Sequence, residues 1–327
     1  MANPSSFLII SLDFELLWGV RDSRGKEYHQ QLLNVHEVVP KLLALFEKYE
    51  VACTWATVGA LLSKNKQNFE ELKPTQYPSY KDKNFSPYPE IDEMLKLDEK
   101  LLFASQLVRK IISTDKQELA SHTFCHYYCL EDGQSIEEFR ADLQSNSVAA
   151  SHYDIHFNSL VFPRNQFNGE YLQACADAGL VCYRGNPSHW AYQPENREGR
   201  SVLRRAFRLL DSYIPLSGSL RQKPLVDSCS GMVDVPASLF FRPWNKKLAV
   251  FEALRLWRIK WSMTRTAKKG GLCHLWWHPH NFGRNVEQNM SNLEQVLRHY
   301  KILQEKYDFK SATMEQAAQE ALVRNGK

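Results

Sequence analysis

The sequence lacks any apolar run long enough to cross a bilayer, and its first residues lack the basic region of a secretory signal. Its seven cysteines stand singly and form no regular framework, which is untypical of a disulfide-stapled secreted protein. Neither an internal repeat nor a low-complexity tract is present. These absences argue against membrane-spanning, fibrous and cystine-rich classes, and we expect a cytoplasmic protein.

A single large domain is the expected organisation. The 327 residues, 43% of them hydrophobic, are enough to bury one barrel-sized core over residues 1–327. Two stretches interrupt the regular pattern and are predicted to be insertions. Residues 64–89 combine prolines with tyrosines and resemble a long loop, and residues 185–231 are predicted to carry a helix over 201–213.

Charge is unevenly distributed along the chain. The net charge is only +4, yet residues 196–269 hold 16 Lys and Arg against five Asp and Glu. A solvated helix face is the commoner explanation of such a run. The alternative is contact with an anionic partner, either a nucleotide or lipid diphosphate carrier or a membrane surface. A nucleic-acid partner is not expected, and any membrane contact would be peripheral.

Short apolar runs alternate with longer helical patterns, which predicts an α/β fold with a parallel sheet. Seven strands are expected: 7–12, 51–58, 118–121, 159–162, 180–183, 232–235 and 271–277. Apolar residues at helical spacing predict helices near 35–46 and 290–300. A further helix is expected over 248–266, with Phe251, Leu254, Trp257 and Trp261 on its core side.

Polar residues follow several of these strands. Asp13 and Glu15 end the first strand, His122 follows the third, Arg164 the fourth and His278 the last. Barrels of βα units place catalysis at the carboxyl ends of their strands, so these side chains are expected to converge.

The two acids and two of the histidines suggest a metal site. Asp13 and Glu15 lie two residues apart on a strand and should point to the same side, one binding a metal and the other accepting a proton. His122 and His126 have the spacing that lets two imidazoles on one helical turn hold one ion. The alternatives are a strand-end turn with an ordinary salt bridge, or a closed structural zinc site that includes Cys125 and Cys129.

Two further residues have candidate roles in the same site. Arg164 could pair with a carboxylate, and Asp13 is its natural partner, although a surface arginine capping a turn is an equal alternative. His278, beside two tryptophans at a strand end, could donate a proton to a leaving amine.

These residues resemble the polysaccharide deacetylases of carbohydrate esterase family four, which share the chitooligosaccharide deacetylase homology domain. The strand ending Asp13-Phe14-Glu15 is similar to the first motif of the family, His122 to His126 matches its H-[ST]-x-x-H motif, and the stretch around His278 is similar to its last motif. The resemblance covers most of the chain. It implies a distorted (β/α)7-type barrel related to the TIM barrel.

The same resemblance implies roles for individual residues. Glu15, His122 and His126 would bind a divalent metal, with zinc expected first and cobalt, nickel or manganese as alternatives. Asp13 would be the base, Arg164 would orient it, and His278 would be the acid. In the family the two acids are commonly adjacent, whereas Phe14 separates them here, so Asp13 is an alternative ligand.

The expected activity is removal of an acetyl or formyl group from an amino sugar in bacterial surface-polysaccharide metabolism. Trp277 and Tyr88 are candidate contacts for the sugar, because aromatic rings stack on sugar faces. Asn165 is a third candidate contact. Two alternatives remain open: a related amidase acting on a small non-sugar amide, and a catalytically degenerate barrel that binds glycans.

Overall fold

A computed structural model describes residues 5–193, 201–324 and 326. One sheet runs through the molecule in the order β6-β7-β5-β4-β3-β2-β1-β9-β8, with β10 added beside β1. The strands are β1 (Ser6–Phe14), β2 (Cys53–Thr57), β3 (Gln117–Ser121), β4 (Ser159–Leu160), β5 (Cys182–Tyr183), β6 (Leu225–Val226), β7 (Val233–Asp234), β8 (Leu239–Phe240), β9 (Gly271–Trp277) and β10 (Lys310–Ala312). All seven predicted strands are present.

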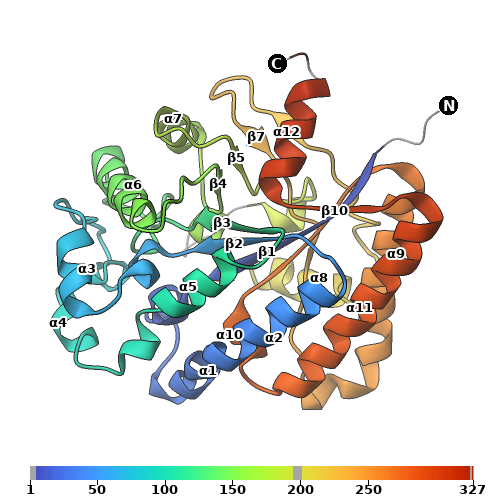
Figure 1. Cartoon of the computed structure of the whole chain (residues 1–327), viewed down its shortest axis with the longest axis horizontal. Helices are drawn as coiled ribbons and strands as arrows, with labels where there is room; N and C mark the ends of the chain where they lie inside the picture. Colours follow the sequence, from blue (N-terminus) through green and yellow to red (C-terminus); the bar gives the residue numbers. More distant parts are fainter. Residues whose placement is uncertain (1–4, 194–200, 325, 327) are drawn as a thin grey trace.

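Every pairing in the sheet is parallel except that of β6 with β7. The central strand β1 pairs with β9 from Ser6 to Leu12 and with β2 from Ser11 to Phe14. The sheet curls, and helices surround it (Figure 1). This architecture confirms the predicted distorted barrel of βα units.

The helices are α1 (His29–Leu33), α2 (Val35–Lys48), α3 (Lys66–Leu72), α4 (Ile91–Met94), α5 (Ser105–Ile112), α6 (Ile136–Ser151), α7 (Gly169–Asp177), α8 (Val202–Asp211), α9 (Glu252–Lys269), α10 (Pro279–Phe282), α11 (Val286–Tyr307) and α12 (Met314–Arg324). The predicted apolar stripes of α2 and α11 are buried, as Val38 and Phe46 on α2 and Leu293 and Leu297 on α11 show. Each such side chain contributes about 1.5–3 kcal/mol through burial. Among the described helices, none has the length and apolar content to cross a bilayer.

The orientation predicted for α9 is wrong. Phe251, Leu254 and Trp257 are 51%, 38% and 47% exposed, so the predicted core stripe faces outward. The helix instead buries Arg255 and Arg258, whose guanidinium groups contact the acids Glu252 and Asp211. Periodicity located the helix, but it could not foresee that paired arginines would occupy the core side.

The barrel wall opens beyond β7. The chain leaves β7, and the amide of Ala237 donates to the carbonyl of Gly185 beyond β5, while the amide of Ser238 donates to the carbonyl of His274 on β9. It then continues as β8, paired with β9. Residues 237–238 therefore cross from the half of the wall that contains β5 and β7 to the half that contains β8 and β9. We call the gap between these two halves the fork.

The insertion predicted as a long loop contains α3, and its tyrosines are mostly buried. Tyr80 is fully buried, and its hydroxyl accepts a hydrogen bond of 2.7 Å from the amide of Tyr128. Tyr88 is 8% exposed and stacks on Tyr77, with ring centroids 3.9 Å apart. The segment therefore packs on the barrel wall.

The two adjacent tryptophans of β9 have opposite environments. Trp277 is fully buried and packs on Phe241 and Phe282, so its predicted role as a sugar contact is wrong. Trp276 points the other way, toward Phe240 and the interior of the fork. One step along a strand reverses the side, and the candidate platform is Trp276.

We expect Trp277→Ala to lower the free energy of unfolding by about 3–5 kcal/mol, because it leaves a cavity in the packed core. Trp276→Ala, one residue away, should cost much less because its ring borders open space. Denaturant titrations of both variants against the wild type measure the difference. Equal losses would contradict the assignment of the two sides.

Candidate metal centre

Glu15 is placed by a sharp bend at the end of β1. The strand ends at Phe14, and Leu16 adopts a positive φ of 45°, which turns the chain into a short helical turn ending at Gly19. A Cβ atom at Gly19 would lie 2.0 Å from the carboxylate carbon of Glu15. Glycine is therefore required there for the Glu15 carboxylate to keep its position.

His122 and His126 are held by a loop, and the predicted helical turn is wrong. β3 ends at Ser121, and residues 122–128 form no helix. Thr123 and His126 have positive φ values of 62° and 64°. The strained backbone at Thr123 and His126 turns the loop back on itself, and this turn brings the imidazole of His126 beside that of His122.

Asp142 anchors this loop from α6. Its fully buried carboxylate accepts hydrogen bonds from the amides of Phe124, at 2.6 Å, and Cys125, at 3.1 Å. Burial raises the pKa of Asp142 to about 6, although the two amide donors oppose this rise. The carboxylate fixes the backbone between the two histidines, and no sequence motif points to Asp142.

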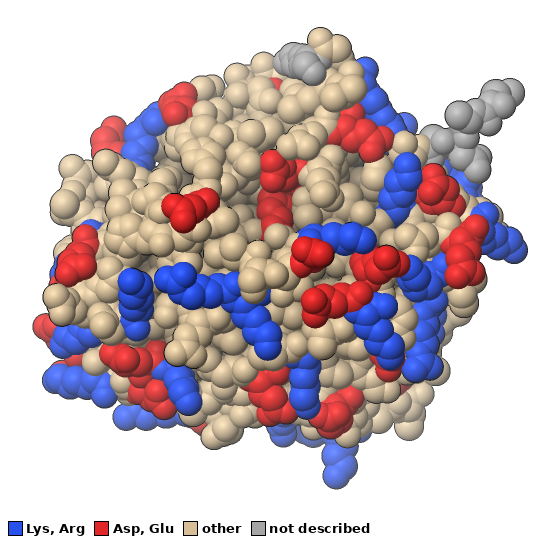
Figure 2. Space-filling view, viewed as in Figure 1, with Lys and Arg blue, Asp and Glu red and all other residues tan. Residues whose placement is uncertain are grey.

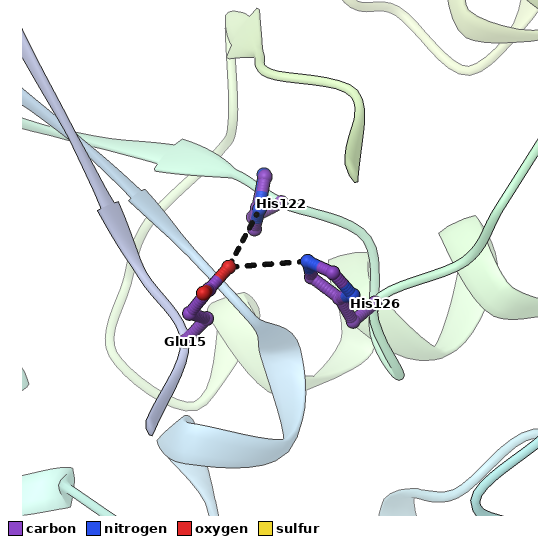
Figure 3. A group of neighbouring side chains, drawn as sticks. All are labelled: Glu15, His122 and His126. Atoms are coloured by element: carbon purple, nitrogen blue, oxygen red, sulfur yellow. Dashed lines mark ion pairs between the residues drawn. The ribbon is translucent and has the colours of Figure 1, made fainter. Parts of the chain in front are cut away.

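Glu15, His122 and His126 converge on one point (Figure 3). The Oε2 atom of Glu15 lies 3.4 Å from His122 Nε2 and 3.1 Å from His126 Nε2. All three side chains are at most 5% exposed. This is the group of potential ligands that the described residues assemble, and it contains neither Cys125 nor Cys129.

The trio fits a divalent cation. His122 Nδ1 donates to the carbonyl of Val161 at 2.7 Å, so Nε2 presents a lone pair, and this buried atom has no hydrogen-bond partner among the described residues. Burial raises the pKa of Glu15, but the imidazoles of His278, His122 and His126 outweigh it and hold that pKa well below its usual range. An ionised carboxylate facing imidazole lone pairs suits zinc and similar ions.

Asp13 is paired with Arg184, so the predicted pairing with Arg164 is wrong. The guanidinium of Arg184 donates to Asp13 Oδ1 at 2.6 Å and to Oδ2 at 2.8 Å. It also donates to Ser11 and Asn165, and it lies 4.4 Å from the ring centroid of Trp276. Burial raises the pKa of Asp13, but Arg184 more than offsets this effect, and the pKa lies below its usual value.

Arg164 belongs to a different network. Its guanidinium pairs with Asp22 and Glu131 and stacks 3.9 Å from the ring centroid of Tyr128. Tyr128 in turn packs edge-on against His126. Arg164 therefore supports the loop that carries the second histidine and does not contact Asp13.

His278 faces both acids, as predicted. Its Nε2 atom lies 3.7 Å from Asp13 Oδ2 and 3.7 Å from Glu15 Oε1, and its side chain is 23% exposed. Its Nδ1 atom lies 3.2 Å from Asn281 Oδ1. His280 stacks on it, and burial lowers the pKa of His280 to about 3, which keeps that ring neutral.

A cleft of about 700 Å³ adjoins the metal centre through His278. It lies in the fork, between Asn186 and Pro187 on one wall and β8 on the other, with Ala237 and Ser238 between them. The predicted contact Asn165 lines this cleft together with Trp276, whereas the predicted contact Tyr88 lies elsewhere, in the core. The volume of the cleft lies within the range of about 300–1,000 Å³ that is typical of small-molecule binding sites.

Comparison with known proteins shows the fold. No family model and no curated protein sequence matches the chain. A candidate polysaccharide deacetylase from Mycobacterium smegmatis is similar over 99% of this chain and 95% of that one, at 14% identity and a TM-score of 0.62. A candidate polysaccharide deacetylase from Pseudomonas aeruginosa PAO1 covers 98% and 90%, at 11% identity and a TM-score of 0.54. PuuE allantoinase covers the same shares at 9% identity and 0.53.

The chain therefore has a polysaccharide-deacetylase-like fold. At its strand ends it carries a cluster of one carboxylate and two imidazoles that could bind a metal, beside a second, arginine-paired carboxylate.

We expect the purified protein to bind about one zinc ion per chain, and His122→Ala or His126→Ala to weaken binding by more than the roughly 10–100-fold typical of losing an outer-shell partner. The reason is that each variant removes one of three ligands. Metal analysis after dialysis against limiting zinc is the measurement.

The chain supplies matched controls for this experiment. His152 and His156 have the same spacing but are exposed, so His152→Ala should leave the metal content unchanged. Cys125→Ser and Cys129→Ser should retain the metal as well. Unchanged metal content in both ligand variants would reject the site.

Proposed function

We propose that this chain is a metal-dependent hydrolase that removes an acetyl or formyl group from the nitrogen of an amino sugar used in a bacterial surface polysaccharide. The observation that supports this most is the clustering of two carboxylates and three imidazoles within a few ångströms of one another at the strand ends. The fold similarity to candidate polysaccharide deacetylases is consistent with it.

The proposed general base is Asp13. Arg184 holds both of its oxygens and keeps the carboxylate ionised, so it can accept a proton from an attacking water. Asp13 lies two residues before Glu15, which belongs to the proposed group of metal ligands together with His122 and His126. In this proposal the two acids, separated by Phe14, have different tasks: Glu15 is a metal ligand and Asp13 is the base.

A divalent cation held by Glu15, His122 and His126, with zinc expected first and cobalt, nickel or manganese as alternatives, would supply the Lewis acidity that activates water and polarises the amide carbonyl. The proposed acid is His278, which would protonate the departing nitrogen. Its Nε2 atom faces the two acids, and its partial exposure gives it access to the cleft.

The cleft favours a sugar over a small cyclic or linear amide. Trp276 offers a ring face, while Asn165 and Asn186 offer amide groups that suit sugar hydroxyls. Its volume also exceeds what a small amide needs. We disfavour a catalytically degenerate barrel because the residues proposed as base, orienting arginine, metal ligands and acid lie close to one another.

We expect Asp13→Asn to retain the metal and lower turnover by about 10²–10⁴-fold, because it removes the proton acceptor. Amine release from a panel of N-acetyl and N-formyl amino sugars, run beside small cyclic and linear amides, measures this. Asp92→Asn, an exposed carboxamide substitution on α4, is the control. Full activity of Asp13→Asn would exclude Asp13 as the base.

We expect Arg184→Gln to move the acid limb of the rate profile to higher pH. Without the guanidinium, burial raises the pKa of Asp13, so the inactive protonated base persists further up the pH scale. Arg184→Lys should shift the limb less, since it keeps the charge but not the two-point contact. Arg164→Gln, which lies outside this pair, should leave the acid limb in place. A shift of the limb in Arg164→Gln but not in Arg184→Gln would support the predicted pairing of Arg164 with Asp13 instead.

A further inference from the structure

The cleft beside His278 is lined by three arginines. Arg205 and Arg208 of α8 line it together with Arg242, which follows β8. None of the described residues that line this cleft is an aspartate or glutamate. A concavity with three guanidinium groups and no carboxylate is suited to an anion that carries several oxygens, such as a phosphate.

These three arginines differ from the buried arginines of the same half of the molecule. Arg184, Arg255 and Arg258 each contact an acid, namely Asp13, Glu252 and Asp211. Among the residues that line the cleft, Arg205, Arg208 and Arg242 face no carboxylate. Three like charges lining one cleft repel one another, and an anionic ligand bound between them would reduce that repulsion.

Exposed apolar side chains gather on the helices beside this cleft, and two of them, Val202 and Leu209, line it. Of the sixteen exposed large apolar residues among those the structure describes, ten lie within 202–216 and 250–257. On α8, Val202 and Leu203 are 77% and 71% exposed, and just before α9, Val250 is 83% exposed. The two stretches touch, since the rings of Tyr213 and Phe251 are 6.1 Å apart. We refer to the exposed apolar side chains of 202–216 and 250–257 together as the apolar rim.

The rim and the arginines occupy the same short helix. Along α8, exposed Val202, Leu203 and Leu210 alternate with Arg205 and Arg208. Apolar side chains beside basic ones on a surface helix are typical of contact with the interface of an anionic bilayer. By contrast, the face shown in Figure 2 carries basic and acidic side chains interspersed, as the pairs between α2 and α11 illustrate.

We infer that the cleft takes an N-acylated amino sugar linked through a phosphate to a lipid, and that the apolar rim rests on the bilayer holding that lipid. This inference rests on the proposed function for the sugar, and it adds the carrier. Arg205, Arg208 and Arg242 bind the phosphate at the membrane surface, the rim enters the headgroup region, and the sugar reaches inward past Trp276 to His278. Exposed valine, leucine and phenylalanine side chains would serve no purpose toward a soluble phosphate.

The test is co-sedimentation of the full-length protein with vesicles of phosphatidylcholine alone or mixed with phosphatidylglycerol. The wild type should bind the anionic vesicles more tightly, and added salt should weaken the binding. Arg205→Ala and Arg208→Ala should each weaken it by about fivefold, the usual contribution of one basic residue near an anionic surface. Leu210→Glu and Phe251→Glu should reduce binding to both kinds of vesicle.

Matched controls place the same change elsewhere. Ile302→Glu on α11 and Val323→Glu on α12 are exposed apolar positions outside the rim and should bind vesicles like the wild type. Circular dichroism and thermal unfolding verify that every variant is folded. Equal binding by rim and control variants, or binding of inorganic pyrophosphate without any binding of vesicles, would overturn the inference.

The two proposals fail separately. Vesicle binding does not involve the metal ligands, so His122→Ala should bind vesicles normally. A wild-type protein that holds zinc and releases amine from soluble amino sugars, but ignores vesicles, would overturn the lipid carrier alone. Vesicle binding by a protein that shows neither metal nor amine release would overturn the proposed function instead.

Discussion

Parallel pairing of β1 with its neighbours is the constraint on which the site depends. Because β1 runs parallel to β2 and β9, and β2 to β3, the carboxyl ends of these strands meet at one rim of the sheet. Strand direction brings Asp13, Glu15, His122 and His278, which lie far apart in the chain, to this rim. The bend at Leu16, the loop after β3 and the pairing of Asp13 with Arg184 then fix the positions of the side chains.

Strand direction explains how much of the site could be predicted from the sequence. Short apolar runs located seven strands, and the rule that polar residues follow strand ends selected Asp13, Glu15, His122 and His278 correctly as neighbours. Arg184 also follows a predicted strand, at 180–183, and the same rule would have found it. Arg164, which follows the fourth predicted strand, satisfies the same rule, and the sequence alone does not show which of the two arginines pairs with Asp13.

Other features depend on long-range contacts that a single sequence does not reveal. The spacing of His122 and His126 fits a helical turn, yet two positive φ values and the buried Asp142 produce a loop with the same outcome. The apolar stripe of α9 predicted a core face, but two arginines with acid partners take that side. In both places tertiary contacts overrode the structure that the local sequence pattern predicted.

The fork in the barrel wall has a consequence for ligand size. Its base is main chain, since Ala237 and Ser238 donate hydrogen bonds to opposite halves of the wall. Opening or narrowing the gap would break one of these bonds, so the backbone acts as a fixed gauge of what can enter. Substitutions on α8 can change which ligands the cleft attracts without changing the width of the gap. The affinity of the cleft for a ligand and the size of ligand that it admits are therefore set by different parts of the structure.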